Sequence, residues 1–178
     1  MKNPSDLTSS KLTQLLAYAG LILLAYELVK SLIIKPTKNI YAYTTFGEGM
    51  PFKSYEEDVL SRHKNEFEAC LYFLRDFMKA INSEDLLAIQ SLRKHRNDVA
   101  HELPKMLNHL DIKNYSLLLE KTINVLFKLS NYNVRMEIGA DPEFKDLDWN
   151  NIAGEEYFIL VEILKKVKII NKEFSKNS

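Results

Sequence analysis

The chain contains few of the residues that end helices and make turns. Only 5 glycines and 5 prolines occur among its 178 residues, and most of them fall within residues 36–51 and 139–154. A β fold with many strands needs many tight turns, and turns depend on these two residue types. The sequence therefore disfavours such a fold and predicts long, uninterrupted helices outside the two segments.

The chain also lacks the residue patterns of common catalytic and metal sites. Its one cysteine, Cys70, lies among apolar residues, which predicts a buried thiol in a reducing compartment and not a catalytic nucleophile. There is no glycine-rich phosphate loop, Cys-x-x-Cys pair, His-Glu-x-x-His motif or Gly-x-Ser-x-Gly motif. We therefore expect no metal site and no cofactor.

The chain has no excess charge of either sign. Lysine plus arginine and aspartate plus glutamate number 24 each, so no field of the whole molecule attracts nucleic acid. Any contact with nucleic acid must therefore be local. With 46% hydrophobic and 27% charged residues, the composition is that of a folded protein, and the length suits a single domain over residues 1–178.

One long apolar run raises the question of a membrane span. Residues 15–34 are mostly apolar, but Glu27 and Lys30 interrupt them before the roughly 20 apolar residues that a span requires. We expect a buried helix that packs centrally or at a subunit interface. The first residues do not resemble a secretory signal, so the prediction is a cytoplasmic protein with no membrane contact. A helical protein anchored by this segment is the alternative.

Apolar spacing and capping residues predict an all-α, single-domain bundle of about five helices. Pro36 should end the first helix, Ser54 and Glu57 should cap the second, Trp149 should anchor a loop, and Phe158 should face the core. The expected helices span about residues 12–34, 54–81, 83–104, 111–132 and 155–174. The expected loops span about 35–53, with a candidate extended segment at 40–43, and 139–154; the expected flexible ends are 1–11 and 172–178.

The densest polar cluster of the chain lies in the third predicted helix. It runs Arg93-Lys94-His95-Arg96-Asn97-Asp98 and continues with Val99-Ala100-His101. Within it, Arg96, Asn97 and His101 resemble the Arg-polar-x-x-x-His signature of the HEPN superfamily. The match falls late in a predicted helix of an all-α chain of suitable length, as that family's pattern requires.

The resemblance implies a helical domain that forms a homodimer, with two copies of the signature helix around one shared cleft. Many members of the superfamily are metal-independent ribonucleases of toxin, anti-phage defence or CRISPR-linked systems, and others are inactive binding or assembly modules. Carried over to this chain, Arg96 and His101 are the catalytic pair, Asn97 is the supporting polar residue and His95 is an auxiliary candidate. Leu103 stands where toxins paired with nucleotidyltransferase antitoxins often carry a tyrosine, which disfavours that arrangement.

The chemistry of RNA cleavage suits this pair. RNA supplies its own nucleophile, the 2′-hydroxyl, so a protein needs only to move protons and to stabilise charge on the phosphate. His101 is a candidate general base or acid, and Arg96 is a candidate phosphate ligand because a guanidinium matches phosphate oxygens. The two residues lie five positions apart, about 140° around a helix, so a dimer would supply the second copy of each.

Two other interpretations stay open. A catalytically silent HEPN module would dimerise or bind RNA, a nucleotide or a partner protein such as an antitoxin. The neutral charge favours it, since ribonucleases that grip long RNA often have a broad basic surface. Outside the family, Arg96 would only bridge a nearby acid, and His101 would only suit the negative end of the helix dipole.

Overall fold

The fold was obtained as a computed structural model, which describes residues 9–106 and 112–176. This part of the chain contains six α-helices, two short 3-10 helices and no strand, so the prediction of an all-α bundle is confirmed. The helices are α1 (Ser9–Tyr43), α2 (Tyr55–Asp58), η2 (Leu60–Arg62), α3 (Glu66–Asp76), α4 (Ser83–Met106), α5 (Ile112–Ile138), η3 (Pro142–Phe144) and α6 (Glu155–Lys176). The predicted flexible ends lie partly outside the described residues.

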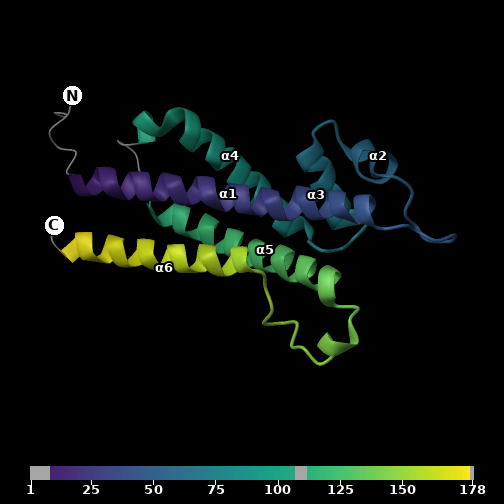
Figure 1. The fold of residues 1–178 in the computed structure, drawn as a ribbon. Coiled ribbons are helices and arrows are strands. Elements are labelled where there is room, and N and C mark those ends of the chain that lie inside the picture. The colour runs from purple at the N-terminus through teal and green to yellow at the C-terminus, as the bar shows by residue number, and fades with distance from the viewer. Residues whose placement is uncertain (1–8, 107–111, 177–178) are drawn as a thin grey trace.

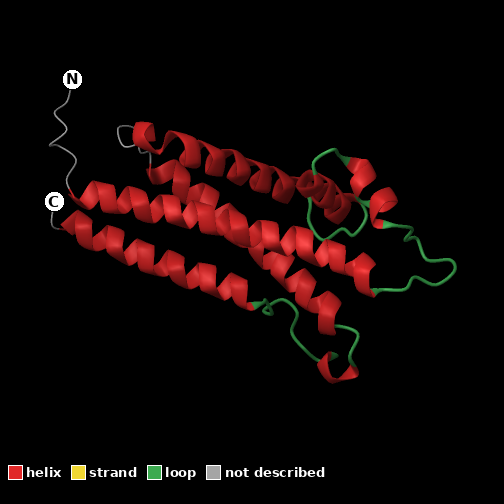
Figure 2. Cartoon of the chain, turned by 45° about the horizontal axis from the view of Figure 1, so that its top comes forward, coloured by secondary structure: helices red, strands yellow, loops and turns green. Residues whose placement is uncertain are grey.

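Four long helices make up the body of the bundle, and successive long helices run in opposite directions (Figure 1). α1 packs against α3, α4, α5 and α6, so it is the central helix. The start of α1, the C-terminal end of α4 and the end of α6 lie at one end of the bundle (Figure 1). Figure 2 shows the two long loops, which follow α1 and α5, at the opposite end.

The core is built around α1. Ile22, Ala25, Val29 and Ile33 of this helix have no exposed surface, and side chains of the other long helices pack on them. By length and composition alone, residues 12–43 pass as a membrane-spanning helix, and 44% of the apolar window is buried within the fold. A core helix of a bundle has this character, because its inward side must be apolar along its whole length.

The first helix does not end at Pro36, as the sequence predicted, but continues to Tyr43 with the proline inside it. Proline has no N–H to donate to the carbonyl of Leu32, four residues earlier. The side-chain amide of Asn133, on α5, donates to that carbonyl at 3.0 Å instead. This replacement bond removes the reason for the helix to stop, so residues 35–43 are helical and the extended segment expected there was wrong.

The second predicted helix is divided. Ser54 caps α2 as expected, accepting a hydrogen bond from the backbone N–H of Glu57 at 3.1 Å, but α2 spans only four residues. The chain turns through η2 and begins again at α3, where the Asn65 side chain accepts from the N–H of Glu68 at 3.2 Å. α3 ends before Lys79, whose φ of 56° lies in the left-handed region. Apolar residues from Phe67 to Ile81 keep spacings of three and four, so the end of α3 at Asp76 could not be seen in the apolar pattern.

The remaining helices differ from the prediction in their length and in which residues point toward the core. α4 continues past Pro104. Proline has no N–H to donate to the carbonyl of Ala100, four residues earlier, but Ala100 is exposed and water can reach it. Phe158 does not face the core: it is 52% exposed, and Leu160 and Leu164 take the inward positions of α6.

The loop at residues 139–154 is fastened to α5 through its backbone. The Asn131 amide donates to the carbonyls of Trp149 and Ile152 at 2.5 and 2.7 Å. The Ser130 hydroxyl accepts from the N–H of Gly154 at 2.6 Å. The Trp149 ring is only half-buried, so these three bonds fix the start of α6 more directly than the ring does.

Candidate functional site

The helix α4 carries every residue of the predicted site. Its first turn is capped by Asn82 and Asp85, whose side chains accept from each other's backbone N–H at 2.9 and 3.0 Å. Leu86, Ile89, Leu92 and Val99 are buried and fix which side of the helix faces the core. This fixes the outward directions of the polar residues in the C-terminal half.

Arg96 lies at the edge of the contact between α4 and α1. Its guanidinium carbon is 5.5 Å from the ring centre of Tyr26, and its Nη2 atom is 3.8 Å from a carboxylate oxygen of Glu27. Nη1 donates to the Asn97 side-chain oxygen at 3.4 Å, and the buried Nε has no hydrogen-bond partner among the residues that the structure describes. The side chain is 33% exposed, so these long contacts orient the guanidinium without using up its donors.

Arg93, one turn earlier, is held much more closely. Its Nη1 atom donates to an oxygen of Glu68 at 2.6 Å, and the Gln90 amide donates to the other oxygen at 3.0 Å. The Glu68 carboxylate is nearly buried, and a buried charge is tolerated only when it is paired and hydrogen-bonded. Arg93 is therefore held by a short ion pair to a nearly buried carboxylate, whereas Arg96 makes only long contacts.

His101 lies on the solvent side of α4. Lys94, Asn97, Asp98 and His101 are all exposed and follow spacings of three and four, which places them on one stripe of the helix. We call these four residues the solvent ridge. Arg96 is about 140° around the helix from His101, so a single chain brings Asn97 and His101 to one face and keeps Arg96 on another.

His95 joins α4 to α1. Its Nε2 atom and the Tyr18 hydroxyl share a hydrogen bond of 2.5 Å, and the two rings are 5.7 Å apart. Burial lowers the pKa of His95, and the Asp98 carboxylate offsets part of this effect. A half-buried histidine that favours its neutral form suits a contact between helices better than a role as a phosphate-binding cation.

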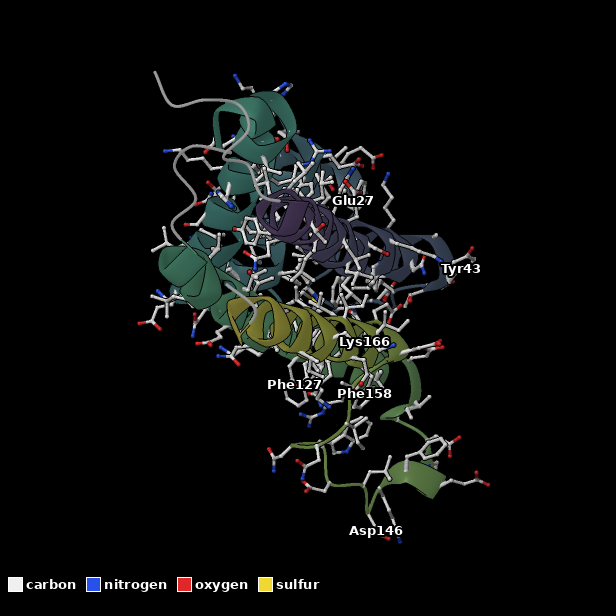
Figure 3. The ribbon with its side chains drawn as sticks, turned by 90° about the vertical axis from the view of Figure 1, so that its left-hand side faces the viewer. Glu27, Tyr43, Phe127, Asp146, Phe158 and Lys166 are labelled. Atoms are coloured by element: carbon white, nitrogen blue, oxygen red, sulfur yellow. The ribbon has the colours of Figure 1, made fainter. Side chains whose placement is uncertain are left out.

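The sequence did not indicate the residues of α1 that surround the site. Tyr18, Tyr26 and Glu27 contact His95 and Arg96 from across the helix interface. The two tyrosines are about two helical turns apart within the most apolar stretch of α1, and this spacing was the available signal. Figure 3 shows Glu27 on the side of α1 away from α6.

No metal site accompanies these residues within the described part of the chain, where no group of three histidine, cysteine, aspartate or glutamate side chains is placed to hold an ion. Cys70 is fully buried.

No protein-family model, curated protein or solved structure matches the chain. The resemblance to the HEPN superfamily therefore depends on the signature residues of α4 alone.

Proposed function

We propose that the chain is a HEPN-type, metal-independent endoribonuclease that acts as a homodimer in the cytoplasm, in a defence or toxin role. Arg96 and His101 are the catalytic residues of this proposal, with Asn97 in support. The observation that carries it concerns the contacts of Arg96: among the described residues, this signature arginine makes only contacts of 3.4 Å or longer to acceptors, and its side chain is one-third exposed. An arginine used only for stability would be expected to close a short ion pair, as Arg93 does.

The reaction needs only groups that this chain carries. His101 accepts the proton of the 2′-hydroxyl, and the oxygen attacks the adjacent phosphorus. The bond from phosphorus to the 5′-oxygen breaks, that oxygen takes a proton from solvent, and the products are a 2′,3′-cyclic phosphate and a 5′-hydroxyl. Arg96 binds the non-bridging oxygens as their charge grows.

A two-fold axis beside α4 is part of the proposal. The solvent ridge holds His101 away from Arg96 of the same chain, so a cleft formed by two copies is needed to bring an arginine near a histidine. Such a cleft would contain both copies of each residue. The exposed position of His101 supports this arrangement, since a buried imidazole would have no access to a second chain.

A silent binding module is the second candidate, and two observations favour it. Arg96 already has the Tyr26 ring and the Glu27 carboxylate as neighbours, and the chain has no net charge to attract RNA. In that case α4 would serve dimerisation or hold RNA, a nucleotide or a partner protein without cleaving anything.

Incubation of the purified protein with single-stranded RNA in EDTA distinguishes the two candidates. The proposal predicts cleavage by the wild type and by His63→Ala, a control at the other end of the bundle. It predicts a loss of about 10² to 10⁴ in rate for His101→Ala and for Arg96→Ala. Cleavage that needs a metal, acts equally on DNA, or persists in either site variant would refute this mechanism. No cleavage by the wild type would leave the silent module.

A further inference from the structure

A groove of about 1140 Å³ runs between α4 and α5 and reaches the loop before α6. Leu87 and Leu117 stand at its rim and are 60% and 55% exposed. Phe127 and Tyr157 line it toward the loop, with their rings 5.2 Å apart in an edge-to-face arrangement. Figure 3 shows Phe127 on the side of the bundle below α6. The groove therefore offers apolar and aromatic surface to a flat ligand.

Polar groups with unused hydrogen-bonding capacity interrupt this apolar surface. Asn124 and Lys121 line the middle of the groove and Asn150 lines the loop end. The side chains of all three have no hydrogen bond or ion pair in the described part of the chain. The lining carboxylate of Asp85 is neutralised by Lys128 at 2.8 Å. Glu84 also lines the groove and is exposed. The groove thus presents two free amides, one free cation and, at the end near the start of α4, one carboxylate.

The groove leads toward the candidate site. Ser91 lines it and lies one turn before Lys94, the first residue of the solvent ridge. His101 follows Ser91 by ten residues, a rise of about 15 Å along the helix. A strand lying with one phosphate at His101 therefore has only a few nucleotides to cross before it enters the groove.

We propose that the groove between α4 and α5 binds a nucleobase-bearing segment of single-stranded RNA, a few nucleotides away from the phosphate that is cleaved. A base packs on the surface formed by Tyr157 and Phe127, Asn124 and Asn150 bond to base edges, and Lys121 contacts a phosphate. This inference rests on the proposed ribonuclease function and names how its substrate is held.

The mixed lining favours a nucleic acid over a partner helix. An amphipathic helix buries a continuous apolar face in a groove of continuous apolar character, and here Lys121 and Asn124 stand in the middle of the path. An unstacked base combines an apolar face with donors and acceptors at its edge, and proteins bind such bases through aromatic rings and amide side chains.

Binding of 2′-O-methyl single-stranded RNA, which lacks the nucleophile, tests the groove without cleavage. Fluorescence anisotropy should show an affinity about tenfold or more lower for Lys121→Ala/Asn124→Ala than for the wild type. The slope of log affinity against log salt should shrink by about 0.7 because one phosphate contact is lost. The control Lys35→Ala/Asn39→Ala removes the same two side-chain types from an exposed stretch of α1 and should bind as the wild type does.

The other possible results of this binding experiment each support or overturn the proposed groove. Unchanged affinity in the groove variant, or no binding by the wild type, overturns the groove even if the wild type cleaves RNA. Lost affinity in the groove variant, in a protein that cleaves nothing, retains the groove and refutes the nuclease. A groove variant that binds RNA normally and loses self-association in light scattering shows that the groove holds polypeptide, and overturns the inference.

Discussion

The two halves of α4 differ in how closely their charged side chains are paired. In the N-terminal half, Asp85 pairs with Lys128 at 2.8 Å and Arg93 with Glu68 at 2.6 Å, and both carboxylates are nearly buried. In the C-terminal half, Arg96 has only contacts of 3.4 Å or longer, and the solvent ridge is open. The N-terminal half thus pairs its charges within the bundle, whereas the C-terminal half joins α1 through His95 and leaves the solvent ridge exposed.

Truncation of a buried residue in the helix should have the largest effect on stability. Leu92→Ala removes a fully buried side chain and leaves a cavity, which should lower the free energy of unfolding by about 2 to 5 kcal/mol. The exposed neighbour Ser91→Ala is the matched control and should change it by less than about 0.5 kcal/mol. Urea unfolding measures both, and equal midpoints would contradict the assignment of this face to the core.

The two arginines provide the sharpest contrast between the halves. Arg93→Ala leaves the nearly buried Glu68 without its cation, so the free energy of unfolding should fall by about 1 to 3 kcal/mol. Arg96→Ala removes only long, partly exposed contacts, and the loss should stay under about 1 kcal/mol. A greater loss for Arg96 than for Arg93 in thermal or urea unfolding would reverse the comparison.

A smaller effect should appear in the pH dependence of stability. Burial lowers the pKa of His95, so the folded chain binds this proton less readily than the unfolded chain, whose value is about 6.5. The stability that neutral His95 provides is complete above about pH 6.5 and falls as the pH drops toward the lowered value. His95→Phe should therefore lose less stability than the wild type between about pH 7.5 and about pH 5.5. Parallel curves for the two proteins would show that the contact between His95 and Tyr18 does not control this behaviour.

Structural features that depend on residues close together in the chain could be predicted from the sequence. Features that depend on contacts between distant residues could not. Scarce glycine and proline and regular apolar spacing indicated the all-α bundle, and the cap at Ser54 was visible locally. The continuation of α1 through Pro36 was not, because it depends on Asn133, which is remote in sequence.

The candidate site shows the same division. The order Arg96, Asn97, His101 placed the signature residues on one helix, and α4 does carry them. Their surroundings on α1, Tyr26 and Glu27, come from a different part of the chain. Arg93 forms the short ion pair and Arg96 does not, because Glu68 of α3 lies beside Arg93. This difference depends on tertiary packing and was not visible in the sequence.

We propose that Arg96 and His101 from two chains share one cleft. A mixture of Arg96→Ala and His101→Ala chains tests it directly, because a mixed dimer keeps one intact copy of each residue on different chains. Unfolding and refolding the two variants together lets the dimers exchange, and cleavage of single-stranded RNA in EDTA is then measured. The mixture should cleave faster than either variant alone at the same total concentration. A mixture no faster than the better variant would contradict a cleft built by two chains.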